Sequence, residues 1–74
     1  SNCPNISYLI RQRALRHMVE YYHENYDADI LYKYLSRIDL DYVEVEDASR
    51  IITYYISLRM YEQAFNGIHR FGYV

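Results

Sequence analysis

Few residues of this sequence have the types and spacing that catalysis or metal binding requires. One pair in the first half comes closest to a metal site. Glu20 and His23 form a Glu-x-x-His, which is the ligand spacing of carboxylate-bridged di-iron helical bundles. Such a site also needs a second Glu-x-x-His and two further glutamates on facing helices, and the sequence has no second copy. His17 and His23 are too far apart round a helix to share a zinc ion. We therefore expect no metal site.

A nucleophile with its base is the second chemistry to consider. Cys3 is the single cysteine, and His17, His23 or His69 could be drawn as its base. A chain terminus does not hold a nucleophile in place, so we expect no catalytic residue, no enzyme activity and no cofactor. A single cysteine also forbids an internal disulfide, which favours a reducing compartment, with the cytoplasm as the default.

Two charged clusters could bind ions. The segment 39–47, DLDYVEVED, carries acids and no base, but it lacks the glycine and the ligand spacing of a calcium loop. A short strand is the alternative there, but no second strand exists to pair with it, so we predict a solvated connector. A basic cluster is more typical of a solvated face than of a phosphate site, and it comprises Arg11, Arg13, Arg16 and His17.

Charge and hydropathy exclude two classes of partner. The formal net charge is −2 at pH 7, which argues against a nucleic-acid surface. A membrane helix needs roughly 20 apolar residues, and charged residues or histidines interrupt every apolar run before that length. We therefore expect neither a nucleic acid nor a membrane as partner. With 74 residues, the chain is one small domain or a piece of a larger array.

The first element that must position these side chains is a helix over about 5–24, a stretch that nothing interrupts. Pro4 suits the first turn of a helix, because its missing N–H costs nothing there. Apolar residues recur with a period of 3.6 in two stripes, and a helix that is apolar on two sides usually lies between two neighbours. The main stripe is Leu15, Met18, Val19, Tyr22 and Tyr26, and the second stripe is Ile6, Ile10, Ala14 and Tyr21.

Three shorter helices follow. Asp27 is a good N-cap for a helix over about 28–37, and Asp47 is a good N-cap for a helix over about 48–58. A last helix is expected over about 61–71, and Gly72 suits the residue just past its end. The predicted buried stripes are Leu31, Tyr34, Leu35 and Ile38 on the second helix, Ala48, Ile51, Ile52 and Tyr55 on the third, and Ala64, Phe65, Ile68 and Phe71 on the fourth.

The two halves of the sequence match each other at an offset of 33 residues. Apolar residues meet apolar residues at the aligned positions, and a period in the thirties is typical of solenoids built from paired helices. We therefore predict an all-α fold of two antiparallel helical hairpins, stacked as a fragment of an α-α superhelix. The matched pairs are Met18 with Ile51, Val19 with Ile52, Tyr22 with Tyr55, Leu31 with Ala64, Leu35 with Ile68, and Ile38 with Phe71.

The second half resembles a tetratricopeptide repeat. That family has a large apolar residue, an aromatic residue four positions later, and a turn followed by Tyr-Glu-x-Ala. Ile51, Tyr55 and the segment 61–64, YEQA, match this pattern, and Met18 and Tyr22 match its beginning in the first half. The chain also resembles large helical proteins of unknown function from anaerobic Gram-positive bacteria.

Several positions depart from the tetratricopeptide pattern. Val19 and Ile52 stand where the family has small residues, Tyr26 or Arg59 stands where its turn has glycine, and its final proline is absent. The resemblance implies one helical-repeat domain over 1–74, with repeats at about 12–38 and 45–72, excised from a longer protein.

The resemblance also implies a function, which is a scaffold for protein–protein interaction without catalysis. The alternative is a structural or oligomerising helical module. In the family, first helices line a groove for a protein or peptide partner, and the corresponding residues here are Arg13, Arg16, Glu20, His23, Ser49, Thr53 and Ile56.

Eleven tyrosines are the unusual part of the composition. Either their rings are half-buried with solvated hydroxyl groups, or part of the set forms a binding face, since tyrosine is enriched at interfaces. The second stripe of the first helix and the apolar C-terminus also lack an assigned partner. We therefore expect the isolated chain to form a homodimer through Ile6, Ile10, Ala14, Tyr21, Phe71 and Tyr73.

Overall fold

The computed structural model describes residues 6–25 and 27–73. In that part the chain is all-α and has no strand, and a single turn of 3-10 helix stands where the alternative strand was considered. Cys3, the candidate nucleophile, and Tyr26, the last residue of the main predicted stripe, lie outside the described residues. In chain order the elements are α1 (Ile6–Glu24), α2 (Ala28–Leu35), η1 (Leu40–Tyr42), α3 (Val45–Ser57) and α4 (Tyr61–Arg70).

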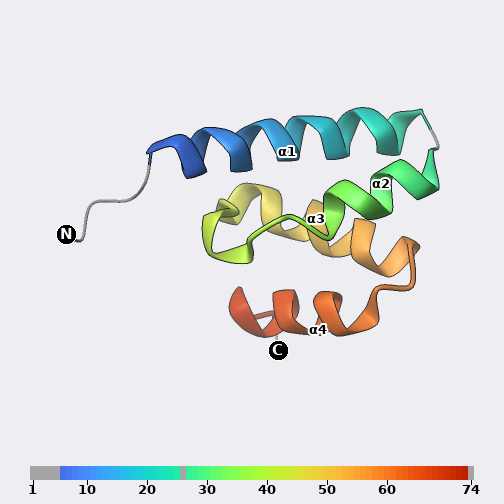
Figure 1. Ribbon diagram of the computed structural model, residues 1–74. Helices are drawn as coiled ribbons and strands as arrows, with labels where there is room; N and C mark the ends of the chain where they lie inside the picture. The colour runs from blue at the N-terminus through green and yellow to red at the C-terminus, as the bar shows by residue number, and fades with distance from the viewer. Residues whose placement is uncertain (1–5, 26, 74) are drawn as a thin grey trace. The chain divides into compact units, whose positions relative to one another are not determined.

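The chain divides into two compact units, and the first, Ser1–Tyr42, contains the hairpin of α1 and α2 (Figure 1). The predicted N-cap is confirmed, because Asp27 Oδ1 accepts a hydrogen bond from Ile30 N across 3.2 Å. Three predicted stripe residues are buried, namely Val19, Leu31 and Leu35.

Helix α2 ends two residues earlier than the predicted range. Its last turn tightens into i to i−3 hydrogen bonds, from Arg37 N to Tyr34 O across 3.0 Å and from Ile38 N to Leu35 O across 3.2 Å. The hydroxyl of Ser36 also donates to Tyr32 O across 2.7 Å. These bonds satisfy carbonyl groups that a longer helix would have satisfied.

The second unit, Val43–Val74, contains the hairpin of α3 and α4 (Figure 1). The predicted stripe of α3 is confirmed in full, and the described core extends to residues that the pattern did not include, Tyr54 and Met60. The buried apolar residues of this unit are Ala48, Ile51, Ile52, Tyr54, Tyr55, Met60 and Ala64.

The predicted start of α3 is wrong, because the helix begins at Val45 and its N-cap is Glu44. Asp47 lies inside the first turn, where its amide donates to Glu44 O across 2.9 Å. Its carboxylate lies 3.5 Å from the guanidinium of Arg50. Negative charge in a first turn stabilises a helix through the helix dipole, so the acidic end of the connector extends α3 rather than capping it.

Phe65 is a second correction, since its side chain is exposed. The buried line of α4 runs through Ala64 and Gly67, and Phe65 lies one residue, or about 100°, further round the helix. Its ring instead packs edge-on against His69 one turn later, with ring centroids 4.8 Å apart.

Two residues of the second unit adopt the left-handed backbone conformation. Gly72 has a φ of 72°, as its predicted place after α4 requires. Arg59, between α3 and α4, has a φ of 61°. Arg59 stands where the tetratricopeptide turn has glycine, and an L-residue with a side chain is strained there.

The turns inside the two hairpins carry the same closing hydrogen bond. Asp27 N donates to Tyr22 O across 3.2 Å, and Met60 N donates to Tyr55 O across 2.8 Å. Both bonds have the 6→1 form that closes a helix C-terminus. Tyr22 and Tyr55 are a matched pair at the 33-residue offset, and Asp27 and Met60 are separated by the same offset. The two turns therefore have the same register.

Candidate functional site

The residues with metal-binding chemistry do not gather into a site in the described part of the chain. Glu20 and His23 lie on α1 and are half-buried. No group of three or more His, Cys, Asp or Glu side chains is placed to hold a metal ion among residues 6–25 and 27–73. Among the same residues, no helix is long and apolar enough to cross a membrane.

The predicted partner-binding residues lie on one face of a helix in each unit. Arg13, Arg16, Glu20 and His23 follow i, i+3, i+7 and i+10 spacing on α1; Arg13 is exposed and the other three are half-buried. Ser49, Thr53 and Ile56 follow i, i+4 and i+7 spacing on α3, and all three are exposed. A groove shared by the two faces stays a prediction.

The predicted self-association residues include a line of exposed apolar side chains on α1, which we call the apolar stripe. It consists of Ile6, Ile10, Ala14 and Tyr21. The exposed fractions of Ile6, Ile10 and Tyr21 are 71%, 63% and 59%, and Ala14 is also exposed. At the other end of the chain, Tyr73 is exposed and Phe71 is half-buried.

A polar clamp that the sequence reasoning missed joins α1 to the segment after α2. Gln12 is buried, and its Oε1 accepts a hydrogen bond from Asp39 N across 2.9 Å. Its Nε2 donates to Arg37 O across 3.3 Å, and Tyr8 Oη donates to Asp39 Oδ2 across 2.8 Å. The bond to the carboxylate raises the pKa of Tyr8. The sequence does contain a signal of this burial. Gln12 lies one helical turn from the apolar residue Leu15, so the two share one side of the helix.

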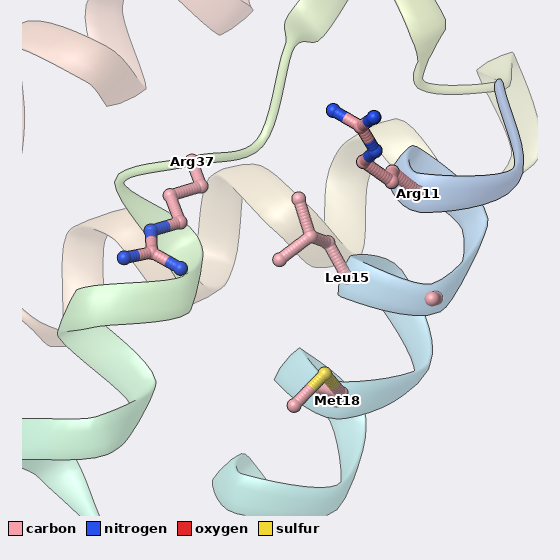
Figure 2. A pocket seen from close by; sticks show the side chains of 5 residues that line it. Arg11, Leu15, Met18 and Arg37 are labelled. Atoms are coloured by element: carbon pink, nitrogen blue, oxygen red, sulfur yellow. The ribbon is translucent and has the colours of Figure 1, made fainter. Parts of the chain in front are cut away.

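The clamp holds Arg37 beside an open hollow on α1. The hollow has a volume of about 290 Å³ and is lined by Arg11, Ala14, Leu15, Met18 and Arg37. Figure 2 shows Leu15 between the two arginine side chains, with Met18 one turn further along α1. The surface of the hollow is therefore mostly apolar, with a positively charged arginine on either side. The sequence could not indicate it, because Arg37 is distant from the other four residues along the chain.

The tyrosines divide between core and surface. Tyr54 and Tyr55 are buried, and burial raises the pKa of Tyr55 to about 12. The rings of Tyr22 and Tyr34 stack between α1 and α2, with centroids 5.7 Å apart. Others are exposed, namely Tyr21, Tyr32, Tyr42, Tyr61 and Tyr73. The tyrosines thus serve packing in each hairpin and also leave aromatic surface in contact with solvent.

Comparison with known proteins places this helical chain in a family. Searches of curated proteins and of solved structures gave no match. The model of the N-terminal part of a family of unknown function, DUF5717, matches residues 1–74. Because this match spans all of the sequence described above, the chain belongs to the DUF5717 family and corresponds to its N-terminal part.

Proposed function

We propose that this chain is a protein-binding module built from paired helices, without chemistry of its own, and that the apolar stripe is a docking surface. The observation that carries the proposal is the exposure of Ile6, Ile10 and Tyr21, each more than half exposed on a single helix. Contiguous exposed apolar surface of this kind usually marks an interaction site. Helix-in-groove and helix-on-helix contacts use the same spacing of apolar residues.

The register of the hairpins supports the further proposal that they are two helical repeats of the tetratricopeptide type. Helices α1 and α3 end at Glu24 and Ser57, and helices α2 and α4 begin at Ala28 and Tyr61. Both pairs of boundaries differ by the 33 residues that separate the matched apolar positions. In an array of such repeats, each unit buries its apolar face on the next, so the apolar stripe would contact either a neighbouring repeat or a separate partner protein.

The charged face of α1 would give such a contact its specificity. Arg13, Arg16, Glu20 and His23 lie beside the apolar stripe on the same helix, and charges at the rim of an interface steer association and select partners. Ser49, Thr53 and Ile56 present the equivalent face of α3. We propose that these faces take part in recognising a protein or peptide partner.

The isolated chain offers a direct test, because a second copy can occupy the apolar stripe. From Ile6 to Tyr21 the stripe extends along roughly 22 Å of helix at 1.5 Å per residue, which is short for a stable interface of about 800 Å² per partner. We therefore expect a weak homodimer with a Kd on the order of 100 µM. Sedimentation equilibrium between 10 µM and 1 mM would measure it.

The test variant is Ile10→Glu. Full burial of an isoleucine contributes about 1.5–3 kcal/mol. Because Ile10 is 63% exposed in the single chain and a symmetric dimer buries it twice, the loss is about 2–4 kcal/mol. Dimerisation should therefore weaken by at least about 30-fold. Val45→Glu is the matched control, since Val45 is exposed and lies in the first turn of α3, outside the stripe. A chain that stays monomeric up to 1 mM, or a dimer that Ile10→Glu and Val45→Glu weaken equally, would contradict the proposal.

A further inference from the structure

We propose that the hollow between Arg11 and Arg37 binds an acidic segment of a partner protein, in which carboxylates flank one large apolar side chain. The floor of the hollow is Ala14, Leu15 and Met18, and the two arginines complete its lining (Figure 2). An apolar floor between two positive charges is complementary to that combination of groups. The site goes beyond the proposed docking of the apolar stripe, with which it shares Ala14 alone.

The open shape of the hollow favours a side chain over a cofactor. Pockets for small molecules and cofactors bury most of the ligand's surface, whereas this hollow of about 290 Å³ is open to solvent. A single leucine or phenylalanine side chain would cover Leu15 and Met18, whereas most of a nucleotide or a larger cofactor would remain in solvent.

The charges favour an acidic occupant. In the described part of the chain, the side chains of Arg11 and Arg37 make neither an ion pair nor a hydrogen bond. The nearest acid along the chain, Asp39, is already engaged by the hydroxyl of Tyr8 and by Asp41 N, at 2.8 and 2.9 Å. Guanidinium groups bind carboxylates through paired, charge-assisted hydrogen bonds, so an incoming acid would supply the partners that both arginines lack.

The clamp holds the backbone at Arg37 in place before any ligand binds. Gln12 binds Arg37 O and Asp39 N, at 3.3 and 2.9 Å, and thereby fixes the backbone that carries Arg37 against α1. Arg11 precedes Gln12 directly on that helix. Binding therefore costs less conformational freedom than it would if the backbone that carries Arg37 also had to become ordered.

The experiment uses a fluorescein-labelled peptide, Glu-Asp-Leu-Asp-Glu with a C-terminal amide, and measures its anisotropy against the full chain. Two comparison peptides replace either the leucine by alanine or all four acids by their amides. We expect each to bind at least tenfold more weakly. Binding of the parent peptide should also weaken as NaCl rises from 50 to 500 mM, because exposed charges are screened by salt.

The protein variants separate this site from general attraction to positive charge. Arg11→Gln together with Arg37→Gln should weaken binding at least tenfold. Lys33→Gln is the control, since Lys33 carries the same charge on α2 and lies 5.9 Å above the ring of Tyr34 instead of in the hollow. It should change binding less than twofold. In amide NMR spectra, the peptide should shift the signals of Leu15 and Met18.

Three results would overturn the proposal. Lys33→Gln could weaken binding as much as the loss of both arginines, which would indicate attraction without a site. Sodium octanoate could bind as tightly as the peptide and displace it, which would make the occupant an anionic lipid. The NMR shifts could fall outside the hollow. Each result is separate from the dimer test, because that test changes Ile10 in the apolar stripe and this one changes Arg11 and Arg37 in the hollow.

Discussion

Gln12 is the residue whose replacement tests most directly how the first unit is assembled. It is buried, with 7% of its surface exposed, and it hydrogen-bonds the backbone at Arg37 and Asp39. Gln12→Leu keeps the size of the side chain and removes both bonds. A typical hydrogen bond contributes about 0.5–1.5 kcal/mol net. Because Arg37 is exposed and Asp39 half-buried, water can partly replace the amide, and we expect a total loss of about 1–2 kcal/mol.

Thermal unfolding followed by circular dichroism would measure that loss. For a domain of this size 1 kcal/mol corresponds to roughly 4–8 °C in Tm, so Gln12→Leu should unfold roughly 5–15 °C lower. Amide hydrogen exchange supplies a local readout, because Asp39 N loses its acceptor and should exchange at least tenfold faster. Gln12→Glu keeps the acceptor for Asp39 N but not the donor to Arg37 O, and should retain part of the protection.

A control and a refuting result complete the test. Gln63→Leu makes the same chemical change at an exposed position on α4, where surface substitutions usually stay within about 0.5 kcal/mol. If Gln12→Leu unfolded at the wild-type temperature and the Asp39 amide exchanged at the wild-type rate, the clamp would contribute nothing to the first unit. Gln12 would then not hold the backbone at Arg37 beside the hollow either.

Three further predictions concern the second unit. Ala64→Leu should destabilise it by about 1–3 kcal/mol in urea unfolding, because Ala64 is buried where α3 packs on α4 and extra methylenes overpack that contact; an unchanged midpoint would show that the position has room. Arg59→Gly should stabilise it by about 0.5–1 kcal/mol, since glycine relieves the strain at φ 61° but increases the entropy of the unfolded chain; a lower Tm would refute this. Burial raises the pKa of Tyr55 from 10 to about 12, so its contribution is fully present below pH 10 and is lost as pH rises toward 12; the difference in unfolding free energy between wild type and Tyr55→Phe should change by roughly 2 kcal/mol between pH 9 and 11.5.

Local rules were sufficient to predict the helices from the sequence. The period-3.6 stripe of α3, the Asp27 cap and Gly72 depend on residues within a few positions of one another, and the structure agrees with each. Errors arose where two local signals competed. Aspartate is a residue type that often caps helices, which favoured Asp47 as the cap. Acidic residues also suit the first turn of a helix, and α3 begins earlier, at Val45. Phe65 is apolar, but its burial depends on how far round α4 it lies from the buried side, which Ala64 and Gly67 define.

The apolar stripe could be predicted from the sequence alone, whereas the hollow depends on the tertiary structure. The spacing of Ile6, Ile10 and Tyr21 by itself determined that α1 has a second apolar side, because helix geometry places those residues on one face. That Gln12 is buried, and that Arg37 lies across the hollow from Arg11, was decided by the packing of α2 on α1. Contacts between residues some 25 positions apart depend on how two helices meet, and no periodicity within either helix contains that information.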